Sequence, residues 1–202
     1  MNKKTILGLI CLAMMTGQGY SQNLSFGPLV GLNITSLKGS NNSNSKTGLL
    51  AGGFFNYSSK NWFGVGIQVL YNEMGANLNN STESINLNYL QVPILAIYYF
   101  KGKNNVGAIR PKLFAGPHLN ILSSVKNKDG NDLNPNDLYY KNTELGIIFG
   151  GGLNYSFAKK IWLNVDLRYG IGLTNAWKND NNVITNNGFG ITAGVSFPLK
   201  SI

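Results

Sequence analysis

The chain has 202 residues, of which 12% are charged, 43% hydrophobic and 11% aromatic, with 25 glycines, one cysteine and a formal net charge of +9. The apolar content is too high for a disordered chain, and a single cysteine excludes a disulfide-stapled scaffold. Soluble domains usually carry about 25% charged residues, so the low charge argues against an ordinary water-facing surface.

The first predicted element is an export signal over residues 1–21. It has a positively charged start with two lysines, an apolar stretch over residues 5–15, and a polar end. Gly19 and Ser21 are the small residues that a signal peptidase requires before its cleavage point. We therefore predict that residues 22–202 form the mature protein, as a single domain without cysteine whose formal charge falls to +7.

The mature chain then alternates between apolar and small or polar residues with a period of two, which is typical of β-strands with one apolar face. Its longest apolar run, residues 92–100, is much shorter than the roughly 20 residues of a membrane-spanning helix. Eight strands are predicted, over residues 24–35, 47–57, 63–71, 89–100, 111–122, 143–157, 161–173 and 189–199.

The connections between these strands alternate between long and short. An antiparallel up-and-down barrel places every other connection at the same end, so the long loops share one end (the loop end) and the tight turns the other (the turn end). Long external loops, short periplasmic turns and an even strand number are typical of bacterial outer-membrane barrels. We predict an all-β fold, an eight-stranded antiparallel up-and-down transmembrane β-barrel in the cell outer membrane.

Aromatic residues support this orientation, because they concentrate at membrane–water interfaces. Most of them lie close to the turn ends of the predicted strands. These residues are Phe54, Phe55, Tyr57, Trp62, Phe63, Tyr98, Tyr99, Phe100, Tyr155, Phe157, Trp162 and Phe197. The sequence thus predicts an aromatic band at the turn end.

Four stretches resemble the PorT-like family of outer-membrane β-barrel proteins from Bacteroidetes-type bacteria. They are YLQVPIL at residues 89–95, KLFAGP at 112–117, GGGL at 150–153 and DLRYGIGLT at 166–174. The resemblance implies a porin-like barrel of the cell envelope. Through the family name, it also implies an accessory role in a protein secretion or gliding machine.

Five polar side chains fall on the face opposite the apolar one and therefore point into the predicted barrel: Lys112, His118, Glu144, Asp166 and Arg168. An eight-stranded barrel is just wide enough for side chains to fill it, and many other inward positions are glycine. We predict a narrow, plugged lumen. Asp166 and Arg168 would belong to a hydrogen-bonded network there, because buried charges require partners.

Basic residues without acidic neighbours occupy the predicted turn end. This basic rim consists of Lys60, Lys101, Lys103, Arg110, Lys159 and Lys160, and Lys112 and Lys200 lie at the same end. We predict that the rim meets anionic phospholipid headgroups of the periplasmic leaflet.

No catalytic, cofactor or metal site is predicted. His118 is the only histidine, no nucleophile motif is present, the mature chain lacks cysteine, and its carboxylates are dispersed. The expected partners are outer-membrane lipid and, through the long external loops and above all residues 124–141, a protein. Nucleic acid is not an expected partner, because the chain is exported and has no binding motif.

Two alternatives remain open at this stage. One is a soluble exported barrel of the lipocalin kind that binds an apolar ligand, with its apolar residues inside and a charged exterior. The other is the accessory secretion component that the family name implies. The strand face rich in Gly, Asn, Thr and Ser disfavours the first, because a soluble exterior would carry many Lys and Glu residues.

Overall fold

The computed structural model describes residues 23–38, 43–59, 62–78, 84–100, 105–126, 131–133, 141–175 and 184–199. The predicted signal over residues 1–21 lies outside these ranges. They contain ten strands: β1 (Asn23–Lys38), β2 (Ser43–Asn44), β3 (Lys46–Ser58), β4 (Phe63–Leu78), β5 (Ser84–Tyr99), β6 (Ile109–Lys126), β7 (Asp132–Leu133), β8 (Thr143–Ala158), β9 (Ile161–Gly172) and β10 (Thr185–Pro198). Among the described residues, no helix is long and apolar enough to cross a membrane.

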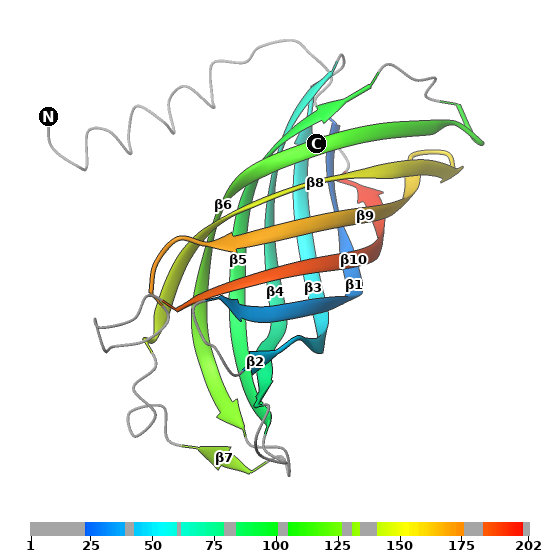
Figure 1. Cartoon of the computed structure of the whole chain (residues 1–202). Coiled ribbons are helices and arrows are strands. Elements are labelled where there is room, and N and C mark those ends of the chain that lie inside the picture. Colours follow the sequence, from blue (N-terminus) through cyan, green and yellow to red (C-terminus); the bar gives the residue numbers. More distant parts are fainter. Residues whose placement is uncertain are drawn as a thin grey trace, which may run out of the picture.

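Eight of these strands close into a barrel in which every neighbouring pair is antiparallel (Figure 1). Each long strand pairs with the next along the chain, and β10 returns to pair with β1, for example at Leu32 opposite Ile191. Closure gives each long strand a partner on both sides along the body of the barrel. The predicted eight-stranded antiparallel up-and-down barrel is confirmed.

The structure differs from the prediction at the loop end, where β1 and β10 extend three or four residues further than expected and β4, β5 and β6 extend beyond the start of β8. β4 continues to Leu78 and β5 begins at Ser84, although residues 73–84 were expected to form a loop. β6 runs on to Lys126, whereas β8 begins opposite Ile121. Backbone pairing continues here, but the described apolar side chains Met74, Leu87 and Val125 are buried and not on the outer face, so the pattern of the membrane-spanning strands is lost. We call residues 73–78, 84–88 and 122–126 the loop-end projection.

Two short strands were also not predicted, and both lie beside the projection. β2 pairs with the end of β4, and β7 pairs with the end of β6. Figure 1 shows β7 at one end of the barrel and the β8–β9 connection at the other. The observed strands therefore keep the predicted division into a loop end and a turn end.

The two faces of the barrel wall have opposite chemistry. On β9, Leu163, Val165 and Leu167 are exposed, whereas the alternating side chains Asn164, Asp166 and Arg168 are buried. Exposed leucine, isoleucine and valine side chains also cover the outside of the other strands, whereas the inside is mixed, with polar side chains beside buried apolar clusters that include Leu50, Leu70 and Leu95. An apolar exterior, with the charged side chains inside, is what a lipid solvent requires of a barrel.

Aromatic side chains form a second band that the sequence analysis did not identify. Three strands carry exposed aromatic residues eight positions apart: Phe63 and Tyr71 on β4, Phe149 and Phe157 on β8, and Phe189 and Phe197 on β10. Eight residues of strand span about 26 Å along the strand axis at ~3.3 Å per residue. A strand tilt of about 35–45° shortens this to a height of roughly 20 Å, somewhat less than the apolar band of about 25 Å in outer-membrane barrels.

The tight β8–β9 turn consists of Lys159 and Lys160. Lys160 has a φ of 67°, the only positive φ at a non-glycine residue in the described ranges. Residues other than glycine adopt this left-handed backbone conformation at an energetic cost, because their Cβ atom comes too close to the following carbonyl oxygen.

We expect Lys160→Gly to raise the free energy of unfolding by about 0.5–1 kcal/mol, since glycine adopts this φ without a steric penalty. The measurement is urea unfolding of the refolded barrel in detergent. Lys159→Gly is the matched control and should lower stability slightly, because it only adds freedom to the unfolded chain. Equal effects of the two substitutions would contradict the backbone argument.

Candidate functional site

The five side chains predicted to point inward all lie in described strands and are all buried. Lys112 and His118 come from β6, Glu144 from β8, and Asp166 and Arg168 from β9. The structure does not gather them into a single cluster. They are distributed along the lumen in separate polar groups, and each group links strands that are not neighbours in the sheet.

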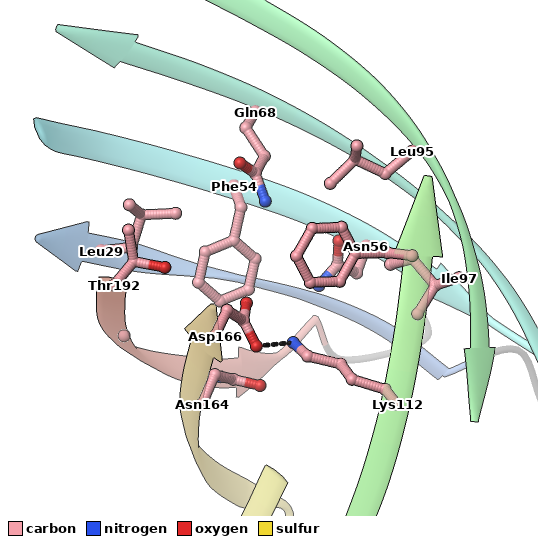
Figure 2. A pocket seen from close by; sticks show the side chains of 12 residues that line it. Leu29, Phe54, Asn56, Gln68, Leu95, Ile97, Lys112, Asn164, Asp166 and Thr192 are labelled. Atoms are coloured by element: carbon pink, nitrogen blue, oxygen red, sulfur yellow. Dashed lines mark ion pairs between the residues drawn. The ribbon is translucent and has the colours of Figure 1, made fainter. Parts of the chain in front are cut away.

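The group nearest the turn end contains an ion pair. Lys112 Nζ lies 2.9 Å from Asp166 Oδ1, and both side chains are about nine-tenths buried. Figure 2 shows the pair beside Phe54, Asn164 and other side chains that line a cavity of about 20 Å³. A cavity of this size holds about one water molecule. Lys112 therefore belongs to the interior and not to the basic rim, although it lies at the turn end.

Arg168 occupies the middle of the lumen and crosses it. Its guanidinium donates to Gln68 Oε1 at 3.0 Å and to Thr192 Oγ1 at 3.1 Å. β9 and β4 lie four places apart in a ring of eight strands, so the bond to Gln68 joins opposite walls. The guanidinium carbon also lies 5.9 Å from the centre of the Phe114 ring, within range of a cation–π interaction.

Glu144 organises the group nearest the loop end. Asn186 Nδ2 donates to its two carboxylate oxygens at 3.0 and 2.9 Å, and the Tyr89 hydroxyl donates to one of them. Glu144 is 2% exposed, so these donors replace the water that its carboxylate loses. Beside it, Gln91 Nε2 donates to Asn120 Oδ1 at 2.9 Å.

His118 lies between these groups, beside a second cavity of about 30 Å³ that is also lined by Arg168, Gln91 and Met74. Its Nδ1 atom has no hydrogen-bond partner among the described residues. Within the same part of the chain, no three His, Cys, Asp or Glu side chains are grouped so that they would hold a metal ion. The lumen thus presents hydrogen-bonded charges and water-sized spaces.

Inward glycines make room for the large lumenal side chains. A Cβ atom at Gly146 would lie 2.5 Å from the His118 ring, and one at Gly150 would lie 2.6 Å from Phe114. A Cβ atom at Gly152 would contact the Asp166 carboxylate. Each of these side chains therefore occupies space that a neighbouring strand leaves empty.

Sequence reasoning missed the neutral partners of the charged side chains, namely Gln68, Thr192, Tyr89 and Asn186. The alternation places Gln68 on the inward face, which is the only signal available. Which inward residue it meets depends on the width and closure of the barrel, because its partner is 100 positions away.

The basic rim is only partly described. Lys159 and Lys160 are exposed in the β8–β9 turn, and the guanidinium carbon of Arg110 lies 4.3 Å from the centre of the Tyr99 ring. Lys60, Lys101, Lys103 and Lys200 lie outside the described residues.

A closed antiparallel barrel with an apolar exterior and buried charged side chains inside defines an outer-membrane β-barrel. Residues 18–178 match the family model of the outer membrane protein beta-barrel domain, and the chain belongs to this family. Its location is the cell outer membrane and its surroundings are lipid, as the sequence predicted. The PorT-like assignment is narrower than this family and stays a prediction.

Solved structures agree on the fold. Neisserial surface protein A (NspA) is 18% identical with a TM-score of 0.56, and the match covers 86% of this chain and 97% of that one. OprG from Pseudomonas aeruginosa is 12% identical with a TM-score of 0.52, covering 91% and 99% of the two chains. At these identities the likeness concerns the fold alone. A search of curated proteins finds no match.

The soluble lipocalin-like alternative is wrong for this chain. It requires apolar side chains inside the barrel and charged ones outside. Here Leu32, Val69 and Leu153 are each more than half exposed on the outer face, whereas Asp166 and Arg168 are buried. The family match points the same way.

Two adjacent glycines test the packing of the lumen. We expect Gly150→Ala to lower the free energy of unfolding by about 1–3 kcal/mol, because the added Cβ overpacks against Phe114 and the Leu167 carbonyl. Gly151→Ala is the matched control, because its Cβ would lie 3.1 Å from a Leu113 methyl group. It should change stability by much less. Urea unfolding in detergent measures the stability of both variants. Equal losses would show that the inward position 150 is packed no more tightly than its neighbour 151.

A double-mutant cycle tests the buried ion pair. We expect Lys112→Met to cost about 3–5 kcal/mol of stability, because it leaves the Asp166 carboxylate buried without its cation. Asp166→Asn should also destabilise the barrel, and the double variant should lose less than the two single losses combined. Strictly additive losses in urea unfolding would show that the two side chains do not depend on each other.

Proposed function

We propose that this protein is a non-enzymatic outer-membrane barrel whose lumen is closed by its own side chains. The observation that carries this proposal is the bond from Arg168 to Gln68, which spans the barrel between opposite walls. Arg168 lines one water-sized cavity, and its partners Gln68 and Thr192 line the other. The guanidinium therefore stands between the two spaces, where it interrupts a path for ions.

The chemistry of the lumen supports a structural role and not a catalytic one. Glu144, Asp166 and Lys112 each bind a complementary partner inside the barrel. The His118 imidazole borders a space for about one water molecule, too small for a substrate. Satisfied buried charges rigidify a core, and they cost stability when one partner is removed.

Recognition would then fall to the loop end, and the loop-end projection is the described surface that supports this. Its inner side is held by Met74, Leu87 and Val125, which pack with Tyr89. This packing supports the three strands beyond the start of β8. The predicted recognition loop over residues 124–141 continues from β6 and lies mostly outside the described residues. The secretion or gliding role implied by the PorT-like resemblance would use this same end, and it stays a prediction.

Conductance across a planar lipid bilayer tests the closed lumen. We expect the reconstituted protein to give no stable conductance steps. Arg168→Gly should give them, because the substitution removes the side chain that separates the two cavities. Arg168→Met is the matched control, since methionine keeps much of the volume without the charge, and it should conduct less than Arg168→Gly. Wild-type steps as large as those of Arg168→Gly would contradict the proposal.

A further inference from the structure

A group of apolar and basic side chains lies on the outer surface of the turn end, where β6 begins and β8 ends. Phe157 is 64% exposed, the highest value among the large apolar side chains that the structure describes, and Val106 and Ile109 are 59% and 58% exposed. Lys159 and Lys160 form the β8–β9 turn, one residue after Phe157. We call these five residues the turn-end patch.

Backbone hydrogen bonds hold the two halves of the turn-end patch together. Ile109 is opposite Tyr155 in the β6–β8 ladder. Beyond that pair, Gly107 N donates to Ser156 O at 2.8 Å, and Ser156 N donates to Ala108 O at 2.9 Å. The segment carrying Val106 is therefore fixed against the end of β8, beside Phe157.

The charge around the patch has a single sign. Asp and Glu are absent from residues 54–66, 96–116, 153–165 and 194–202. These segments include every end and connection of the long strands from β3 to β10 at the turn end. The nearest carboxylate along β9 is Asp166, which is buried and paired with Lys112. No acidic side chain in these segments therefore competes with an anionic ligand for Lys159 and Lys160.

We propose that the turn-end patch binds an anionic glycerophospholipid of the periplasmic leaflet. Val106, Ile109 and Phe157 continue the apolar outer wall and contact the acyl chains. Lys159 and Lys160 lie just beyond them, at the level where the phosphate of the headgroup lies, and lysine stems extend along apolar surface while the ammonium reaches the polar layer. The continuity with the lipid-facing wall favours a lipid over an acidic protein segment.

Native mass spectrometry of the folded protein in detergent tests this proposal. The protein is titrated separately with phosphatidylglycerol and with zwitterionic phosphatidylethanolamine of the same acyl chains. We expect the first phosphatidylglycerol to bind more tightly, by up to about fivefold for each lysine that contacts it. High salt should remove the difference, because screening at 1 M salt acts over about 3 Å.

Charge-reversal variants identify the site. Lys159→Glu/Lys160→Glu should abolish the preference for the anionic lipid. Lys38→Glu/Lys141→Glu makes the same change in net charge at the loop end and should keep the preference. Equal losses in both variants would show that only the net charge matters and would overturn the site. Equal binding of both lipids by the wild type would overturn the proposal and favour an acidic protein segment as the occupant.

Two further variants complete the design. Phe157→Ser should weaken the binding of both lipids equally, because it removes contact with the acyl chains without altering the charge. Unchanged binding would overturn the apolar half of the site. A shift in gel mobility between unheated and boiled samples confirms that each variant is folded. If the double Glu variant does not fold, Lys159→Gln/Lys160→Gln replaces it and should reduce the preference without reversing it.

Discussion

The structure depends on one constraint, the need to satisfy every backbone N–H and C=O group without help from the solvent. Hydrocarbon offers no hydrogen bonds, and each unsatisfied group would cost several kcal/mol. A sheet meets this requirement only when its first and last strands pair, as β1 and β10 do over most of their length. The alternating connections, the even number of long strands and the filled lumen all follow from that closure.

Closure also explains why the polar residues are inside. Once the outer face is in contact with lipid, the alternation of a strand sends every second side chain into a space about as wide as two facing side chains. Asn164, Asp166 and Arg168 therefore take the positions that leucine and valine hold in a soluble protein. They are tolerated because amides, hydroxyls and opposite charges from other strands meet them there.

Much of the fold was predictable because it repeats locally. Period-two alternation, seen most clearly in residues 189–199, identifies a strand without any knowledge of its partner, and the rhythm of long and short connections fixes the topology. The alternation also marks Glu144 and Arg168 as inward-facing. It does not reveal that Arg168 meets Gln68, because that pairing depends on barrel diameter and on strands 100 residues apart. The loop-end projection was missed for a different reason, since strands outside the membrane need no apolar face.

The bond between Arg168 and Gln68 also bears on how the barrel assembles. It joins the third and seventh of the eight long strands, so its two ends meet only when the sheet has curled far enough to bring opposite walls together. An open, partly curled sheet would leave the guanidinium in a wide, hydrated trough at little energetic cost. The same charge would then lose its water as the two edges join. Thr192, on the neighbouring strand β10, can bind Arg168 before closure, whereas Gln68 on β4 cannot, so the bond to Gln68 couples the joining of the two edges to the burial of this charge.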